Sequence, residues 1–381
     1  MSQLGGAGGA GGAGGAGGAG GAGGAGGAGG AGGAGGIGGA GGSLIGTMAD
    51  AFANPIMVDA LIHSREGITV PEFSHYQPGL PGIDDPEQMK RWEPWVRAYV
   101  AVGEIMQGIA FQGVADGFQV LSSGSLIAEI QRPAPATFEQ QIPLVLNWAE
   151  LRNERATEIL AQIDPQYAFW SSVVFLHPER TRHTLELVNI VLQFCVYVEM
   201  RFKHALGCYR PVEYNAEIQP MITTPGHGSF PMGHATQTYA VAYVLGKLLQ
   251  LDPNNAAHKW VIDQLDRLSA RITTNRVIAG MHFPADSMAG RMLGVALGEY
   301  FVGRCTGNGT FMNRKFLAST GVDLHPTTDF NPFNTTIAPV QKLSQGPFYY
   351  EEEGDDVQLS PLLGYLWDWA QEEWEGRFGV P

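Results

Sequence analysis

Hydrophobic positions along the chain recur at intervals of three and four residues, the period of one face of an α-helix. Six segments carry this pattern over helix-length ranges, at residues 91–114, 143–163, 179–206, 234–251, 255–280 and 284–303. The alternation of apolar and polar residues that is typical of a half-buried strand is weak throughout. The pattern therefore predicts an all-α helical bundle with irregular N- and C-terminal extensions.

Composition divides the chain into four regions. Residues 1–43 form a tail in which Gly-Gly-Ala repeats, and this tail is interpreted as either a flexible segment or, because three residues make one polyproline-II turn, an assembly device. Residues 44–90 form an irregular extension and residues 91–305 the helical domain. Residues 306–381 form a second irregular extension, which ends in acidic and aromatic residues.

The 381 residues are 44% hydrophobic and 16% charged, as in ordinary globular proteins, and a net charge of −14 argues against a nucleic-acid partner. An anionic ligand would need a local basic pocket. The cysteines Cys195, Cys208 and Cys305 form no C-x-x-C pair and are predicted to be free thiols. No secretory signal and no run of eighteen apolar residues is visible. We therefore expect a cytoplasmic protein without a membrane span, with a non-classical export route left open.

Two clusters of polar residues stand at predicted helix ends. Lys203 and Arg210 are seven residues apart, close to two helical turns, and Pro211 disfavours helix at Arg210. His234 follows Gly233 at the start of a helix, where free N–H groups and the helix dipole favour an anion. A histidine at such a site can exchange protons with that anion near neutral pH.

The third cluster is "NRVIAGMHFPADSMAG". Arg276 ends one predicted helix, and Pro284 suits the first turn of the next. His282 is therefore predicted at the junction, with Asp286 one turn later and close enough to orient the imidazole ring. Each cluster taken alone is most often structural.

Together, the order and spacing of the three clusters resemble a known signature: lysine, six residues, Arg-Pro; then Pro-x-Gly-His; then arginine, five residues, histidine, three residues, aspartate. This signature is shared by the vanadium-dependent haloperoxidases and the type-2 phosphatidic acid phosphatase superfamily, which includes bacterial acid phosphatases. The resemblance covers residues 203–286 and implies a helical fold with an oxyanion site.

The resemblance implies that three cations, Lys203, Arg210 and Arg276, hold the oxygens of a bound phosphate or vanadate. Gly233 would donate a backbone N–H to the same oxyanion. Such an anion is stabilised by charge-assisted donors around it. Met232 departs from the family pattern, which usually has a serine there, and a thioether cannot replace the hydroxyl donor.

The resemblance also implies roles for the two histidines. His234 is similar to the general acid–base residue, and His282 to the residue bonded to the central atom, with Asp286 fixing its ring. His282 would be the nucleophile of a phosphatase or the axial vanadium ligand of a haloperoxidase. Asn275 stands where the family usually has a serine.

His227 separates the two activities. A histidine seven residues before the acid–base histidine resembles bromoperoxidases, whereas a phenylalanine there resembles the fungal chloroperoxidase type. The resemblance therefore implies a vanadium-dependent haloperoxidase with orthovanadate as cofactor, although phosphate can occupy the same site. Hydrogen peroxide would oxidise bromide or iodide to a hypohalous-acid equivalent that halogenates a small organic acceptor, with Lys203 polarising the bound peroxide. Haloperoxidases of this type imply a homo-oligomer, a dimer or larger.

Two alternatives stay open. In a phosphatase, His282 would attack a phosphomonoester and His234 would protonate the leaving group, without a metal. In a structural protein, the glycine-rich tail would drive assembly and the helical core would be catalytically degenerate, with Met232 as the supporting departure. A zinc hydrolase is disfavoured because the neighbouring cations would repel a divalent metal.

Overall fold

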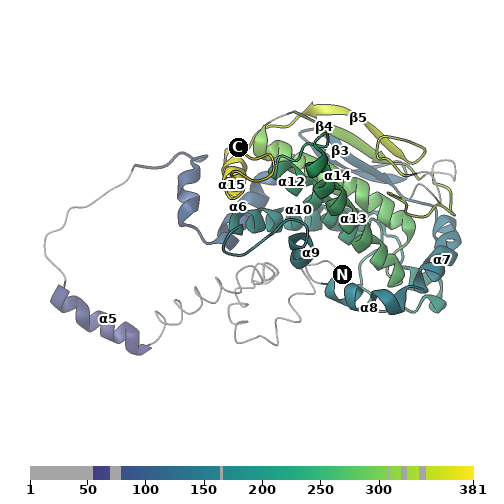
Figure 1. Cartoon of the computed structure of the whole chain (residues 1–381), viewed down its shortest axis with the longest axis horizontal. Helices are drawn as coiled ribbons and strands as arrows, with labels where there is room; N and C mark the ends of the chain where they lie inside the picture. Colours follow the sequence, from purple (N-terminus) through teal and green to yellow (C-terminus); the bar gives the residue numbers. More distant parts are fainter. Residues whose placement is uncertain (1–54, 69–78, 164–165, 308, 319–323, 334–339) are drawn as a thin grey trace.

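The computed structural model describes residues 55–68, 79–163, 166–307, 309–318, 324–333 and 340–381 (Figure 1). Helices make up most of the described chain: α5 (Pro55–Ile68), α6 (Pro94–Ile105), α7 (Pro135–Ala149), α8 (Arg152–Ala161), α9 (Tyr167–Ser171), α10 (Arg182–Leu206), α11 (Pro211–Tyr214), α12 (Gly233–Leu248), α13 (Ala256–Ile278), α14 (Pro284–Thr306) and α15 (Pro361–Glu372). Two short 3₁₀ helices are η1 (Pro86–Arg91) and η2 (Ala216–Ile218). None of the helices in these ranges is both long and apolar enough to cross a membrane.

The prediction of an all-α fold is wrong, because the described residues also form a five-stranded mixed sheet in the order β1-β2-β3-β4-β5. Its strands are β1 (Ile109–Val114), β2 (Gly117–Ser122), β3 (Ser125–Gln131), β4 (Thr310–Phe316) and β5 (Tyr349–Asp356). The first three strands form an antiparallel meander, β3 pairs with β4 in parallel, and β4 pairs with β5 antiparallel. The sheet lies along one side of the helical body (Figure 1).

The segment 91–114 shows where the helical pattern misled. The helix α6 ends at Ile105, and Gly108, at φ 76°, turns the chain into β1. Two-residue turns then connect β1 to β2 and β2 to β3, with Asp116 and Ser123 both in the left-handed region. Such tight turns suit the twist of antiparallel strands. The strands form because they cover a helical core, which a local sequence pattern does not record.

The two extensions are also more regular than predicted. The region 44–90 contains α5 and η1, and the region 306–381 contains β4, β5 and α15. β4 and β5 complete the sheet that β1–β3 begin more than 170 residues earlier. The tail at 1–43 lies outside the described residues.

The other five predicted helical segments are confirmed. The segment 143–163 falls on the second half of α7 and on α8, and the remaining four correspond to α10, α12, α13 and α14. A line of glycines on α14 lets α12 approach closely, because a Cβ at Gly290 would lie 2.5 Å from the carbonyl oxygen of Met232, and one at Gly294 would overlap the carbonyl of Thr236. This close packing sets the start of α14 against the start of α12.

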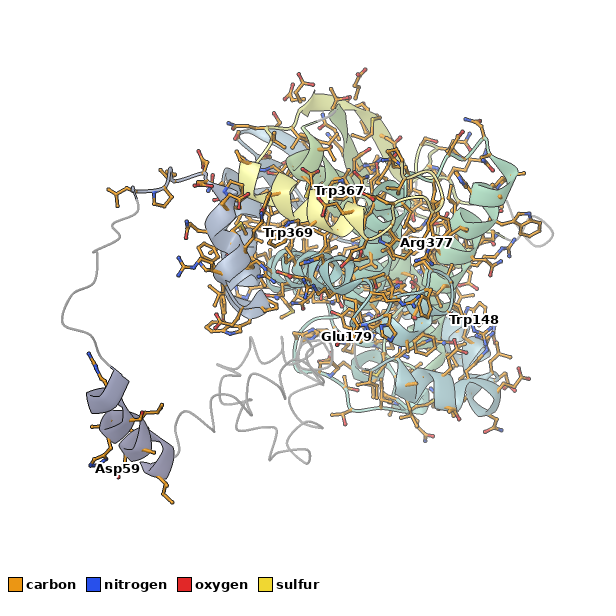
Figure 2. All side chains as sticks on the ribbon, turned by 60° about the vertical axis from the view of Figure 1, so that its left-hand side comes forward. Asp59, Trp148, Glu179, Trp367, Trp369 and Arg377 are labelled. Carbon is orange, nitrogen blue, oxygen red and sulfur yellow. The ribbon has the colours of Figure 1, made fainter. Side chains whose placement is uncertain are left out.

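The helix α15, near the C-terminus of the sequence, packs against α10. Trp367 and Trp369 lie on α15 (Figure 2), and Trp367 is buried in the core. Just after α15, the Glu373 carboxylate accepts the backbone N–H groups of His183 (2.8 Å) and Thr184 (2.9 Å). These are free N–H groups of the first turn of α10, so Glu373 caps the helix that carries Lys203 at its other end.

Candidate active site

The predicted site residues come from the ends of four helices and the loops between them. Lys203 lies in the last turn of α10, and Arg210 directly precedes α11. Gly233 and His234 begin α12, and Arg276 lies in the last turn of α13. The remaining predicted residues lie in the connecting loops or at helix starts, namely His227, Met232, His282 and Asp286. Of these nine residues, His227 is half-buried and the other eight are buried, and the contacts described below link them into one site.

The ring of His282 is held between a cation and a carboxylate. Arg210 Nη1 lies 2.9 Å from His282 Nε2, and Asp286 Oδ2 lies 2.8 Å from His282 Nδ1. A guanidinium can only donate, so Nε2 accepts, which assigns the proton to Nδ1, where it is donated to Asp286. Burial and then the charges of Arg210 and Lys203 hold the pKa of His282 well below its usual value. The ring is therefore neutral, with a lone pair on Nε2.

The Lys203 ammonium is enclosed by backbone carbonyls of the loop before α12. Its Nζ donates to the carbonyl oxygens of Gly228 (3.2 Å), Ser229 (2.9 Å) and Pro231 (2.5 Å). Burial, followed by the charge of Arg210, lowers its pKa to about 7. The same carbonyls fix the approach to Gly233, so this lysine also shapes the loop.

Arg276 brings unused donors to the site. Its Nη2 donates to the carbonyl oxygen of Ile159 at 2.8 Å, whereas its buried Nε and Nη1 have no hydrogen-bond partner among the described residues. Burial lowers its pKa to about 10, so it stays charged at neutral pH. A buried cation with unpaired donors is unfavourable unless an anion completes its contacts.

A small cavity of about 10 Å³ joins Arg276 to the two histidines. Its lining combines three polar residues, His234, Arg276 and His282, with three apolar ones, Ile163, Ile222 and Met281. The volume holds about one water molecule. The unpaired guanidinium donors and two neutral rings lining one cavity fit an oxyanion, which would need the surrounding side chains to move apart slightly.

His234 is fixed by the end of α8. Its Nε2 lies 2.9 Å from the carbonyl oxygen of Gln162, so Nε2 carries the proton and donates it. Burial, followed by the charge of Arg276, holds its pKa well below the usual value. The ring is neutral with a lone pair on Nδ1, which is the state of a general base.

His227 contacts Arg210, one of the three predicted anion-binding cations. Its Nδ1 lies 3.1 Å from Arg210 Nη2, and its carbonyl oxygen accepts from Arg210 Nε at 3.2 Å. Its Nε2 is buried without a partner among the described residues. Burial and the charge of Lys203 lower the pKa of His227 to about 3, so this ring is neutral as well.

The two departures from the family pattern have structural roles. Met232 is fully buried, and its backbone N–H donates to the carbonyl oxygen of Asp286 at 3.0 Å, joining the starts of α12 and α14. Asn275 donates from Nδ2 to Gln162 Oε1 at 2.9 Å. Met232 contributes no hydroxyl donor, so an oxyanion at this site would depend on the cations and the backbone for its contacts.

Sequence reasoning missed Glu199 and Gln162. Glu199 lies one helical turn before Lys203 and accepts from Gln237 Nε2 at 3.0 Å. Burial raises its pKa, and Lys203 opposes this rise. The four-residue spacing to Lys203 was a usable signal for Glu199, whereas nothing in the sequence connects Gln162 to residues more than 70 positions away.

Gly233→Ala is expected to destabilise the protein by about 1–3 kcal/mol. A Cβ at Gly233 would lie 2.9 Å from Glu199 Cδ and would overlap its Oε1. Gly246→Ala on the same helix is the matched control, because its Cβ meets nothing within 4 Å and alanine favours the helix. Urea unfolding measures both. Adding Glu199→Ala should recover part of the loss, and a Gly233→Ala protein as stable as Gly246→Ala would contradict this packing.

Sulfate affinity is expected to fall as pH rises from about 6 to about 8. Burial lowers the pKa of Lys203 to about 7 and raises the pKa values of Glu199 and Asp286 to about 7. As pH rises, the lysine loses positive charge and the carboxyls gain negative charge, so all three changes disfavour an anion. Sulfate keeps its charge over this range, so calorimetric titration isolates the protein groups. A constant or rising affinity would contradict this charge assignment.

Comparison with known protein families agrees with the site. Residues 184–304, which run from α10 to α14, match the model of the PAP2 superfamily. This superfamily includes phosphatases and haloperoxidases. A comparison with the curated proteins finds no match.

Proposed function

We propose that the protein is a vanadium-dependent haloperoxidase that oxidises bromide or iodide with hydrogen peroxide. The observation that carries this choice within the superfamily is His227. Its neutral ring contacts Arg210, and Arg210 contacts His282, so the residue that resembles the bromoperoxidase type reaches the oxyanion site. Its Nε2, which has no partner among the described residues, leaves one polar atom for a ligand in the site.

The residues present fit vanadate as they fit phosphate. His282 would hold the metal through the lone pair on Nε2. Arg276 would bind the oxygens through its Nε and Nη1, which have no partner among the described residues. Lys203, whose three N–H groups already donate to carbonyls, would act through its positive charge. When bound, vanadate supplies a Lewis acid that activates peroxide, and the vanadium keeps its oxidation state. A move of Arg210 from His282 Nε2 to an oxygen would free that lone pair.

The protein's own side chains would transfer protons, orient His282 and exclude water. His234 Nδ1 accepts a proton from the incoming peroxide and can return it to a leaving oxygen. Asp286 keeps the proton of His282 on Nδ1, so that Nε2 stays available. The apolar side chains of Ile163, Ile222 and Met281 line part of the cavity and limit the access of water. The proposal includes self-association as a homodimer or larger, for which the glycine-rich tail is one candidate segment.

The test is vanadate-dependent bromination. The purified protein, treated with orthovanadate, peroxide and bromide, should brominate a dimedone-type reporter, and it should do so at a much lower rate after vanadate is removed. His227→Phe should lower bromination while leaving orthovanadate binding within about threefold, because it removes no cation. Absence of bromination at saturating orthovanadate would refute the haloperoxidase reading.

The second candidate is a phosphatase with a phosphohistidine intermediate. The favouring observation is the proton arrangement, because His282 Nε2 has the lone pair of a nucleophile and His234 lies on the same cavity. Hydrolysis of an aryl phosphate without added metal, inhibited by orthovanadate, would select this activity. Silence in both assays would favour the structural alternative, in which the tail drives assembly.

A further inference from the structure

The C-terminal end of α8 closes one wall of the site, although α8 lies outside the sequence signature. The helix ends at Ala161, so the carbonyl groups of its last turn have no partner within the helix. One of these carbonyls, and that of Gln162 just after the helix, accept hydrogen bonds from site residues. Ile159 O accepts from Arg276 Nη2 at 2.8 Å, and Gln162 O accepts from His234 Nε2 at 2.9 Å.

The side chain of Gln162 is fixed in one orientation. It is fully buried, and its Nε2 donates to Glu158 Oε1 at 3.0 Å. A carboxylate only accepts, so the amide nitrogen must face Glu158 and the amide oxygen must face the other way. That oxygen accepts from Asn275 Nδ2 at 2.9 Å and lies 3.4 Å from Arg276 Nη2.

The two charged groups beside Gln162 differ in their pairing, because Glu158 has a cationic partner and Arg276 has no anionic one within the described ranges. The Glu158 carboxylate is paired with Arg271, whose Nε and Nη2 lie 2.8 Å and 2.7 Å from its two oxygens. Arg276 forms no ion pair within the described ranges and is held by neutral oxygens alone. The negative end of the α8 dipole favours its charge without neutralising it.

We propose that Gln162 is a positioning residue of the oxyanion site. It orients Arg276 and His234 through neutral oxygens and so leaves the positive charge of Arg276 for the bound oxyanion. This inference rests on the proposed oxyanion chemistry, in either its haloperoxidase or its phosphatase form. A carboxylate at position 162 would instead compete with the oxyanion for Arg276.

The test compares Gln162→Glu with Gln162→Leu in the full chain, using calorimetric titration with orthovanadate and with phosphate. At low pH the introduced carboxyl is protonated, can donate to Glu158 and should leave affinity close to that of the unaltered protein. As pH rises to about 8 it ionises beside Arg276, and affinity should fall about tenfold or more relative to the unaltered protein. Gln162→Leu should lose a few-fold in affinity at every pH, because it removes the neutral acceptor without adding charge.

Gln193→Glu is the matched control, a half-buried glutamine on α10 about 15 Å along the helix from Lys203. The anion affinity of Gln193→Glu, divided by that of the unaltered protein, should not change with pH. A flat ratio for Gln162→Glu, or unchanged affinity in Gln162→Leu, would overturn the role of Gln162 while the proposed function stands. If the unaltered protein binds neither anion, both proposals fall. A pH-dependent ratio without bromination supports Gln162 and refutes only the haloperoxidase reading.

Discussion

His282→Ala is expected to lower turnover by about 1000-fold or more, whichever of the two activities is present. The substitution removes the ring whose Nε2 lone pair is held ready by Asp286 on one side and by Arg210 on the other. No other described side chain offers a neutral acceptor nitrogen between that cation and that carboxylate. Steady-state rates of bromination and of aryl-phosphate hydrolysis measure the effect.

His204→Ala provides the matched control. His204 is exposed on α10 next to Lys203, so its removal changes the histidine content near the site without entering it. Added imidazole should restore part of the activity of His282→Ala, because the truncation leaves a space of ring size between Arg210 and Asp286. Turnover of His282→Ala above about a tenth of the original rate would remove this histidine from the chemistry.

The helical part of the fold could be predicted because apolar residues recur at three- and four-residue intervals in the segments that form it. The segments at α10, α12, α13 and α14 carry that period without interruption. The sheet could not be predicted in the same way, because β4 pairs with β3, which lies far away in the sequence, and β5 pairs with β4. The segment at β1 failed for a local reason, since its apolar spacing continued that of α6 past the turn at Gly108.

The site was more predictable than the fold because its chemistry resides in short segments at helix ends. The signature at 203–286 located the cations, both histidines and Asp286 without knowledge of the sheet. The walls of the site were not predictable, because Gln162 reaches His234 and Asn275 only after α8 has packed beside α13. The spacing of Gly290, Gly294 and Gly298 was a readable sign of the close α12–α14 contact that sets Asp286 against Met232.

The placement of charge would allow this acidic protein to hold an anion. The net charge of −14 repels anions at long range, yet Lys203, Arg210 and Arg276 are each at most 2% exposed. Burial weakens screening by solvent and salt, so these nearby cations dominate the field inside the cavity. Glu199 and Asp286 offset part of that charge, and their distance from the anion determines how much.

Asp286→Asn is expected to change turnover and anion affinity in opposite directions. Asp286 Oδ2 accepts both from His282 Nδ1 and from the backbone N–H of Phe283 at 3.1 Å. An amide oxygen in the same place would accept both bonds, so the His282 proton would stay on Nδ1 and the ring would keep its position. The change therefore removes the negative charge with little change in shape.

Without that charge, His282 Nε2 becomes less basic, and turnover should fall about 10- to 100-fold. The site as a whole becomes more positive, so sulfate should bind more tightly. Both effects should be largest near pH 8, because burial raises the pKa of Asp286 to about 7 and the carboxyl is fully charged only above it. Turnover and sulfate affinity are measured on the same preparation. A joint loss would indicate structural damage, whereas unchanged turnover would show that Asp286 does not act through His282.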